Sequence, residues 1–222
     1  MPNGSGEGRL KMQKLNIEFD LDGVLIDYHS CLEKFLADRM IKMIPTGNFH
    51  FQTEPEIPPE RLQRLIYKAM WEYDRINPFP EVPSVLKELY NMTGDPIRIT
   101  TARPYHVAHP TMDCIEKALG PIPFSVSFVS SGTDKHKFLT KGCYIDDRRR
   151  TCLDLAKRGF TVFMPERDYN MPIGPEDGVD FCYRGKWEIS HRFFNIGKIG
   201  NIIIIEDLEC LLYPENLSRI LS

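Results

Sequence analysis

The chain has 222 residues, six cysteines and a formal net charge of −3. This length suits one α/β core with a modest insertion. The small net charge excludes a global basic field that would recruit nucleic acid or an acidic membrane. The longest apolar run near the C-terminus, at 202–205, is the size of a strand and far too short to cross a bilayer.

The N-terminus and the cysteines indicate where the protein resides. Residues 1–13 are polar and rich in Gly and Ser, which predicts a disordered leader. The cysteines form no C-x-x-C pair and no pairing with His at zinc spacing. No signal peptide is recognisable, so we expect reduced thiols and a cytoplasmic protein.

The first strand is expected at 15–19, where polar and apolar residues alternate. The region 28–74 is mostly helical in pattern, and Met40 and Met43 continue the helical spacing of its first half. A Pro-rich connector at 45–59 separates the two helical stretches, because proline interrupts a helix. This region is therefore a candidate helical cap.

Strand and helix patterns alternate through the middle of the chain. The expected strands are 97–100, 124–129, 143–145 and 160–164, and the expected helices are 84–89, 112–118 and 151–158. Such alternation is typical of a parallel sheet with helices on both faces. We therefore predict a Rossmann-like α/β core, at 14–27 and 75–175, with the small cap at 28–74 inserted after the first strand.

The C-terminal stretch, 176–222, is harder to interpret. Strands are expected at 181–183 and 202–205, and a helical turn at 208–212. These elements could complete the sheet, form a dimer contact or cover the site, and the pattern leaves all three open.

Two acids, Asp20 and Asp22, directly follow the first predicted strand in the run FDLDGVL at 19–25. Gly23 permits a sharp turn, so both carboxylates can project into the crevice above the sheet, where ligand sites of α/β folds lie. A lone D-x-D often only solvates a strand end. D-x-D-G-V-L after an apolar strand near the start of an α/β chain is much more specific.

Two later strands also end in chemically useful side chains. The strand at 97–100 runs into Thr100 and Thr101, whose hydroxyls could bind a phosphoryl group or only form a turn or helix cap. Asp146 and Asp147 follow the strand at 143–145. Adjacent acids after an apolar run are costly unless they bind a cation or are otherwise paired. The alternative is an N-cap for the next helix, with Asp147 or Arg148 near its start.

In order, these features resemble the four motifs of the haloacid dehalogenase superfamily. The matching positions are D-x-D-G at 20–23, a threonine in T-x-R at 101–103, a lysine in the loop at 135–141, and D-D at 146–147. The resemblance covers about residues 15–170. Lysines in a loop are usually solvated surface, and it is their place in this order that gives them weight.

The resemblance implies a mechanism. Asp20 would attack the phosphate and form an aspartyl phosphate, and Asp22 would act as general acid and base. Magnesium would be held by Asp20, the Asp22 backbone carbonyl and Asp147, with Asp146 supporting through water. The candidate phosphate-binding residues are Thr101, Thr100, Arg103, Lys135 and Lys137. Thr101 fits T-x-R better than Thr100, and Lys135 is preferred narrowly over Lys137.

More loosely, the chain resembles the 5′(3′)-deoxyribonucleotidase branch. The matching pieces are the helical cap, NPFPEVP at 77–83, IDDR at 145–148 and DYN at 168–170. This implies a (deoxy)nucleoside monophosphate as substrate and a homodimer as the assembly. In that branch aromatic residues near the cap stack on the base, and here Phe49, Phe51, Trp71 and Tyr73 are candidates. Filling the small core of the cap is the alternative for each.

Three functions compete at this point. The first is a nucleotidase, and the second is a phosphatase for another small ester or a nucleic-acid 3′-end. The basic triplet at 148–150 could clamp such an end, although a solvated helix start is the preferred explanation. The third is a non-catalytic binding module, which the clustered acids disfavour. The expected partner is a small phosphate ester, with no membrane involved.

Overall fold

The computed structural model describes residues 13–45, 51–72, 76–130, 132–140, 142–167, 170, 191–195 and 201–221. The expected leader (apart from Gln13) and the expected strand at 181–183 lie outside the described residues. None of the helices within these ranges has the length and apolarity needed to cross a membrane.

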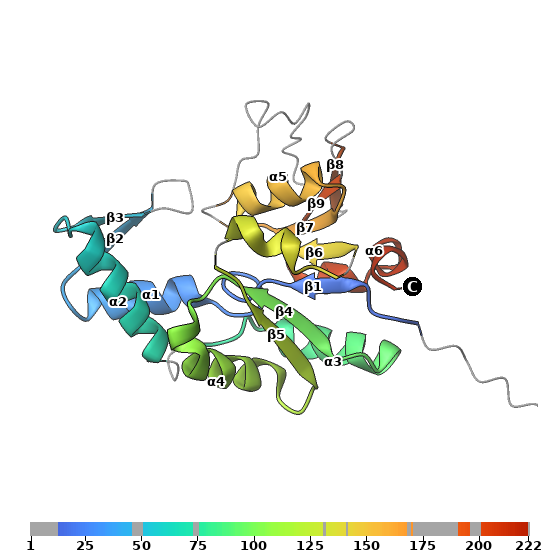
Figure 1. The fold of residues 1–222 in the computed structure, drawn as a ribbon, viewed down its shortest axis with the longest axis horizontal. Coiled ribbons are helices and arrows are strands. Elements are labelled where there is room, and N and C mark those ends of the chain that lie inside the picture. Colours follow the sequence, from blue (N-terminus) through green and yellow to red (C-terminus); the bar gives the residue numbers. More distant parts are fainter. Residues whose placement is uncertain are drawn as a thin grey trace, which may run out of the picture.

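A mixed sheet forms the centre of the fold (Figure 1). Its order is β5 (Phe124–Phe128), β4 (Ile97–Thr101), β1 (Ile17–Phe19), β6 (Cys143–Ile145), β7 (Thr161–Pro165), β9 (Asn201–Ile205) and β8 (His191–Asn195). All neighbours pair in parallel except β8, which runs antiparallel to β9 at the edge. The α/β fold predicted from the sequence is confirmed, and the run at 202–205 adds a strand to the sheet.

Helices cover both faces of the sheet, with α5 on one side and α3 and α4 on the other (Figure 1). Their bounds are Val82–Thr93 for α3, Ala108–Leu119 for α4 and Arg149–Lys157 for α5. Successive residues of a strand bury themselves in different cores: Phe163 packs into the cluster beneath α3 and α4, whereas Val162 and Met164 pack against α5. Burial on both faces explains the continuous apolar runs of these strands.

Short helices close the chain. A 3-10 helix occupies Leu208–Leu212, which confirms the helical turn predicted there. The helix α6 (Pro214–Ile220) follows it. α6 lies beside the beginning of β1, because the Asn16 amide donates to the Ile220 carbonyl at 2.6 Å. This is the end of β1 opposite to Asp20.

The cap lies beyond one end of the sheet (Figure 1) and contains strands as well as helices. It consists of α1 (Tyr28–Ala37), β2 (Lys42–Pro45), β3 (Phe51–Glu54) and α2 (Pro59–Trp71), and β2 pairs antiparallel with β3. The expected helical spacing through Met40 and Met43 is wrong. α1 ends at Ala37, and the exposed Met40 takes a positive φ of 58°.

Prolines explain why these cap strands escaped prediction. The stretch at 45–59 was interpreted as a connector because proline excludes a helix, but Pro45 ends β2 and Pro55 directly follows β3. Proline is tolerated at the ends of short strands. Ile41 and Met43 are buried and Lys42 between them is exposed, which is the alternation of a strand.

One antiparallel bridge, between Ile26 and Pro78, joins the two segments that connect the cap to the core. The Asp27 amide donates to the Asn77 carbonyl at 2.9 Å, and the Phe79 amide donates to the Leu25 carbonyl at 3.3 Å. Within the cap, the Tyr28 hydroxyl donates to the Ile66 carbonyl at 2.7 Å and so ties the start of α1 to α2.

Candidate active site

The predicted acids leave the sheet together at the carboxyl ends of neighbouring strands. β1 and β6 pair up to Phe19 and Ile145, and the Asp20 amide then donates to the Ile145 carbonyl at 2.8 Å. The chain turns sharply after Asp20, with Gly23 at a φ of 78° and its amide donating to the Ile26 carbonyl at 2.9 Å. Glycine takes this left-handed conformation without the clash that a Cβ would cause.

Lys135 lies between the two acidic loops. It comes from the 3-10 helix at Gly132–Lys137, and its Nζ is 2.8 Å from Oδ1 of Asp20 and 2.6 Å from Oδ2 of Asp146. Only 1% of Lys135 is exposed. A buried charge of this kind is costly unless paired, and the two carboxylates supply the pairing.

This burial shifts the pKa values of both partners. Burial raises the pKa of Asp20 to about 7, because desolvation and the charge of Asp146 outweigh the attraction to Lys135. Burial alone would lower the pKa of Lys135, but Asp146 and Asp20 more than offset it and hold that pKa well above its usual value. The site is therefore an ammonium group surrounded by carboxylates that repel one another.

The raised pKa of Asp20 predicts how stability depends on pH in the metal-free protein. The pKa rises from 3.8 to about 7 on folding, so the folded chain holds a proton between these values that the unfolded chain releases. Stability from this group is greatest below about pH 4 and falls as pH rises towards 7. Asp20→Asn removes the penalty, and we expect its melting temperature in EDTA to exceed that of the wild type.

The increase is expected to be largest above pH 7, to shrink steadily below pH 7, and to disappear near pH 4. Differential scanning calorimetry in EDTA across this range measures it. A difference that is independent of pH would contradict the origin proposed here.

The donor set fits a hard divalent cation. Carboxylate oxygens of Asp20, Asp146 and Asp147 lie within 4.8 Å of one another, and all three residues are buried. Lys135 neutralises only part of their charge. Oxygen-only ligands of this kind suit Mg²⁺. The geometry thus agrees with Asp20 and Asp147 as ligands, while Asp146 is engaged by Lys135 and by the Arg148 amide at 2.8 Å.

Arg103 was expected to bind phosphate, but here it binds Asp22. Its Nη2 lies 2.7 Å from Oδ1 of Asp22 and its Nε lies 2.9 Å from Oδ2, a bidentate pair. Nη1 also donates to the Thr111 hydroxyl on α4 at 3.3 Å. Burial lowers the pKa of Arg103, but the charge of Asp22 more than offsets it, so the pKa is raised. Arg103 thus fixes the plane of the Asp22 carboxylate.

The two candidate threonines have different surroundings. Thr101 lines the site cavity and accepts a hydrogen bond from the Arg103 amide at 3.2 Å. A hydroxyl that accepts can still donate its own hydrogen. Thr100 instead donates to buried Glu18 at 3.2 Å and is not among the residues that line the cavity. The geometry favours Thr101 as the phosphate ligand.

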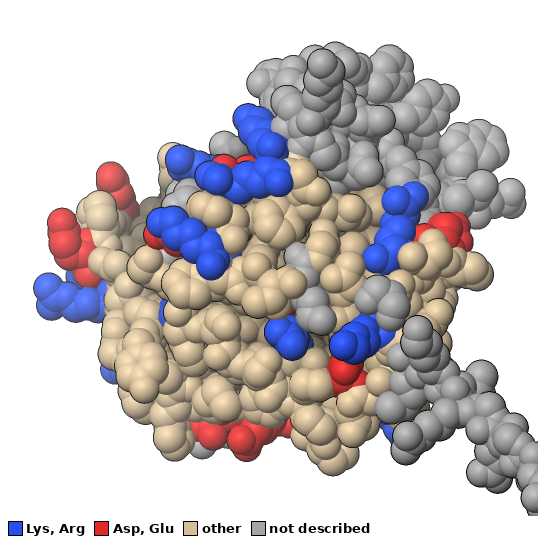
Figure 2. Space-filling model, turned by 45° about the vertical axis from the view of Figure 1, so that its right-hand side comes forward, with Lys and Arg blue, Asp and Glu red and all other residues tan. Residues whose placement is uncertain are grey.

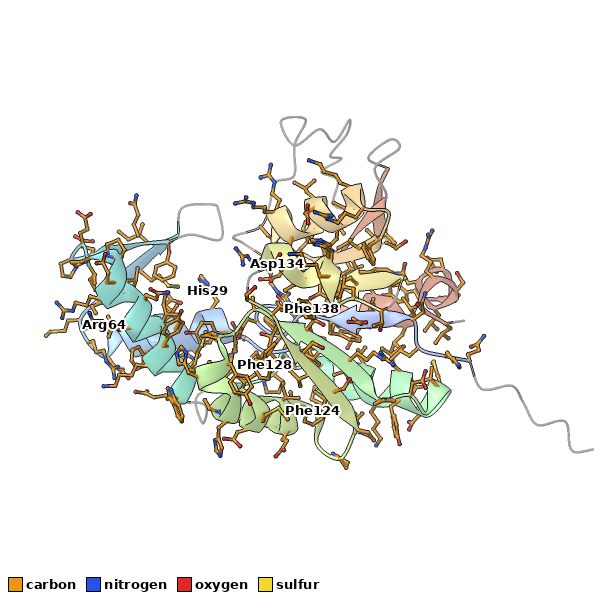
Figure 3. The ribbon with its side chains drawn as sticks, viewed as in Figure 1. His29, Arg64, Phe124, Phe128, Asp134 and Phe138 are labelled. Carbon is orange, nitrogen blue, oxygen red and sulfur yellow. The ribbon has the colours of Figure 1, made fainter. Side chains whose placement is uncertain are left out.

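The two candidate lysines, Lys135 and Lys137, also differ in their surroundings. Lys137 is largely exposed, and its Nζ lies 2.6 Å from Oδ1 of Asp134 on the same turn. Figure 3 shows Asp134 and Phe138 on the core side of the site, with His29 on the cap side. Lys135 is the lysine that reaches the acids.

A cavity of about 250 Å³ opens over these groups, between core and cap. Its cap-side lining is mainly apolar and aromatic and comprises Tyr28, His29, Leu32, Phe51, Ile66, Tyr67 and Met70. Of the aromatic candidates, Phe51 lines it. Trp71 does not: it lies at the last position of α2 and is 52% exposed. Phe49 and Tyr73 lie outside the described residues.

Sequence reasoning missed Tyr28, His29 and Tyr67 among the residues that line the cavity, whereas Arg148 was considered only as part of a basic clamp. A signal existed for some of them. Tyr28 and His29 begin the helix directly after the first acid pair, and Tyr67 follows Ile66 on the apolar stripe of α2. Its ring packs edge-on against His106 of the core, with centroids 4.9 Å apart.

No protein-family model matches the chain, and no curated protein matches it. Solved structures do. CbbY from Rhodobacter sphaeroides, in complex with phosphate, matches with a TM-score of 0.52 and 13% identity over 92% of this chain and 99% of that one. A hydrolase from Pseudomonas syringae matches with a TM-score of 0.50 and 16% identity, over 94% and 100%. At these identities the likeness establishes the fold, which is haloacid-dehalogenase-like.

Proposed function

We propose that the chain is a magnesium-dependent phosphatase that hydrolyses (deoxy)nucleoside monophosphates through an aspartyl phosphate on Asp20. The observation that carries the proposal is the position of the Asp20 carboxylate, in a cavity where Lys135 and Asp147 also converge and Asp22 lies beside it. A binding module would gain nothing from burying acids that repel one another.

The chemistry proceeds in two steps. A carboxylate oxygen of Asp20 attacks phosphorus, the ester P–O bond breaks, and the leaving oxygen takes a proton that Asp22 brings to it. Asp22 then removes a proton from water, the water oxygen attacks phosphorus, and the P–O bond to Asp20 breaks. Inorganic phosphate leaves, the Asp20 carboxylate is released, and Asp22 again holds one proton, as it did at the start of the cycle. Arg103 keeps the Asp22 carboxylate oriented for both transfers.

Charge on the phosphoryl oxygens needs compensation in both steps. The Lys135 ammonium and the Thr101 hydroxyl supply donors at the cavity floor. Bound Mg²⁺, held by Asp20, Asp147 and the Asp22 carbonyl, would supply further positive charge. Asp146 keeps Lys135 in place.

The lining on the cap side of the cavity suits a leaving group with a flat, largely apolar surface. Tyr28, Phe51 and Tyr67 offer aromatic surface to it, and every nucleobase can stack through its π-face. The volume, about 250 Å³, is slightly smaller than that of most ligand pockets, which span roughly 300–1,000 Å³. A monomeric substrate suits it better than the end of a polymer.

A nucleic-acid end is the second candidate, because Arg148 lines the cavity and begins the basic triplet. On the face drawn in Figure 2, basic and acidic side chains lie in small separate groups, without a continuous basic track. A polynucleotide would need such a track along its backbone.

A substrate screen tests the proposed function. Phosphate release is measured with Mg²⁺ on nucleoside and deoxynucleoside monophosphates, sugar phosphates, and oligonucleotides phosphorylated at the 5′ or 3′ end. We expect kcat/KM for the best monophosphate to exceed that for sugar phosphates by about 10-fold or more, since each stacked base contributes about 1–3 kcal/mol. Preference for the oligonucleotides would support the second candidate, and no release from any compound would overturn both.

Tyr67→Ala is expected to raise KM for a nucleotide by about 5- to 50-fold by removing aromatic surface from the cavity, with a much smaller effect on glycerol phosphate. Tyr105→Ala is the matched control, because Tyr105 is 79% exposed and packs on Phe128 instead. Steady-state kinetics on both substrates measure the effect. Equal losses on both would show that Tyr67 does not contact the base.

A further inference from the structure

The proposed metal site is assembled from two separate loops. One follows β1 and contributes Asp20, and the other follows β6 and contributes Asp147. The last backbone hydrogen bond between the two strands runs from the Asp20 amide to the Ile145 carbonyl at 2.8 Å, so the pairing reaches Asp20 but stops short of Asp147. Besides Lys135, which contacts Asp20 and Asp146, further contacts must therefore hold the two loops. Two side chains after β7 make such contacts.

Arg167 binds the first loop. Its Nε donates to the Gly23 carbonyl at 2.9 Å, and its Nη1 donates to the Glu166 carbonyl at 3.2 Å. The guanidinium lies over the ring of Phe79, 4.0 Å from the centroid. The Glu166 amide in turn donates to the Ile205 carbonyl of β9 at 2.8 Å. The turn that carries Asp20 and Asp22 is thereby anchored to the end of the sheet.

Asn170 binds the second loop. Its Nδ2 donates both to the Asp147 carbonyl, at 2.9 Å, and to the Pro165 carbonyl at the end of β7, at 2.8 Å. Its Oδ1 accepts from the Arg167 amide at 2.9 Å. Asn170 is 4% exposed, and one carboxamide thus connects the loop of the second acid pair, the last residue of β7 and the residue that holds the first loop.

We infer that Arg167 and Asn170 are positioning residues that together hold the two halves of the proposed Mg²⁺ site at a fixed separation. Neither side chain is a ligand. Arg167 fixes the position of the Gly23 carbonyl, which directly follows the Asp22 carbonyl in the chain. Asn170 fixes the position of the backbone carbonyl of Asp147 itself. The inference rests on the metal site of the proposed function but not on the identity of the substrate.

The expected signature is a loss of metal affinity. Removing partners that orient metal ligands lowers affinity by about 10- to 100-fold in general. Arg167→Gln and Asn170→Ala are each expected to weaken Mg²⁺ binding within that range. Because both side chains fix the same separation, the double variant should lose less than the product of the two single losses.

Isothermal titration of Mg²⁺ into the substrate-free protein measures this without turnover. Asn216→Ala is the matched control for Asn170→Ala: Asn216 is also a buried asparagine, it donates to the Cys210 carbonyl at 2.7 Å, and it lies on α6 near the other end of β1. Arg158→Gln is the control for Arg167→Gln, since Arg158 pairs with Asp154 on the surface of α5. Both controls should bind Mg²⁺ like the wild type, and Arg167→Lys should recover part of the loss.

Thermal melts separate positioning from general destabilisation. The inference holds if Mg²⁺ affinity falls in the Arg167 and Asn170 variants while Asn216→Ala melts lower but binds normally. It is overturned if both variants bind within about twofold of the wild type, or if the wild type binds no Mg²⁺. Normal Mg²⁺ binding without phosphate release from any ester would instead contradict the proposed function and leave the inference standing. If Asn170→Ala does not fold, Arg167→Gln alone decides, since Arg167 is only partly buried.

Discussion

Replacement of Asp20 by asparagine is expected to lower kcat for phosphate release by about 10⁴-fold or more, a loss typical of removing a catalytic nucleophile. The amide has nearly the shape of the carboxylate but lacks its nucleophilic charge. Lys135 keeps Asp146 as a partner at 2.6 Å, so the fold should survive. Phosphate release under saturating substrate and Mg²⁺ measures the loss.

Asp154→Asn is the control for Asp20→Asn. It removes one carboxylate from a surface ion pair with Arg158 on α5, and exposed pairs of this kind contribute little. We expect unchanged kinetics for Asp154→Asn. Residual activity of Asp20→Asn within about 10-fold of the wild type would contradict covalent catalysis by Asp20.

Lys135→Met is expected to lower both the catalytic activity and the stability of the protein. Methionine fills a similar volume, but the carboxylates of Asp20 and Asp146 would face each other without an ammonium group. Breaking a buried pair by removing one partner costs about 3–5 kcal/mol, and kcat/KM should fall about 10³-fold through lost charge on the phosphoryl oxygens. Urea denaturation and steady-state kinetics measure the two effects.

Lys137→Met is the matched control, two residues away on the same turn. Lys137 is exposed and pairs only locally with Asp134, so we expect a stability change below about 0.5 kcal/mol. Mg²⁺ should also restore part of the stability of Lys135→Met, because the cation replaces lost positive charge. Equal effects of the two methionine variants would show that Lys135 is not the buried partner of these acids.

The sequence predicted the core of the fold because its elements carry strong local patterns. Apolar strands alternate with amphipathic helices, and chemically active residues lie at the ends of three strands: Thr101 is the last residue of β4, and Asp20 and Asp146 directly follow β1 and β6. Parallel strands bring such positions to one edge of the sheet. The strand ends therefore predicted that the acids and the hydroxyl lie close together, whereas the lysine was assigned to the site only through the resemblance in motif order.

The sequence could not predict which partner each charged side chain takes. Arg103 fits a phosphate-binding motif, yet its guanidinium meets Asp22 because α4 and the turn after β1 bring the two together. Arg167 and Asn170 act through backbone carbonyls far away in the sequence. A backbone carbonyl can accept a hydrogen bond whatever its own side chain is. The identity of the accepting residue therefore gives no sequence pattern from which such a contact could be predicted.

The cap was predicted least well. Helical spacing identified the apolar stripe of α2. The β2–β3 pair depends instead on contacts between two segments whose prolines favour the prediction of irregular structure. The aromatic lining is a tertiary outcome too. Phe51 turns toward the cavity from β3, whereas Trp71, at the exposed end of α2, does not.

The most direct test of the central claim is to trap the covalent intermediate. With p-nitrophenyl phosphate, whose leaving group needs no proton, Asp22→Asn should still form the aspartyl phosphate but hydrolyse it slowly, since the general base for water is lost. After reaction with substrate, borohydride reduces an acyl phosphate to the alcohol, and peptide mass spectrometry should then find homoserine at position 20. Phosphate release by the wild type with no modification of Asp20 in either protein, or homoserine at position 147 instead, would contradict the account.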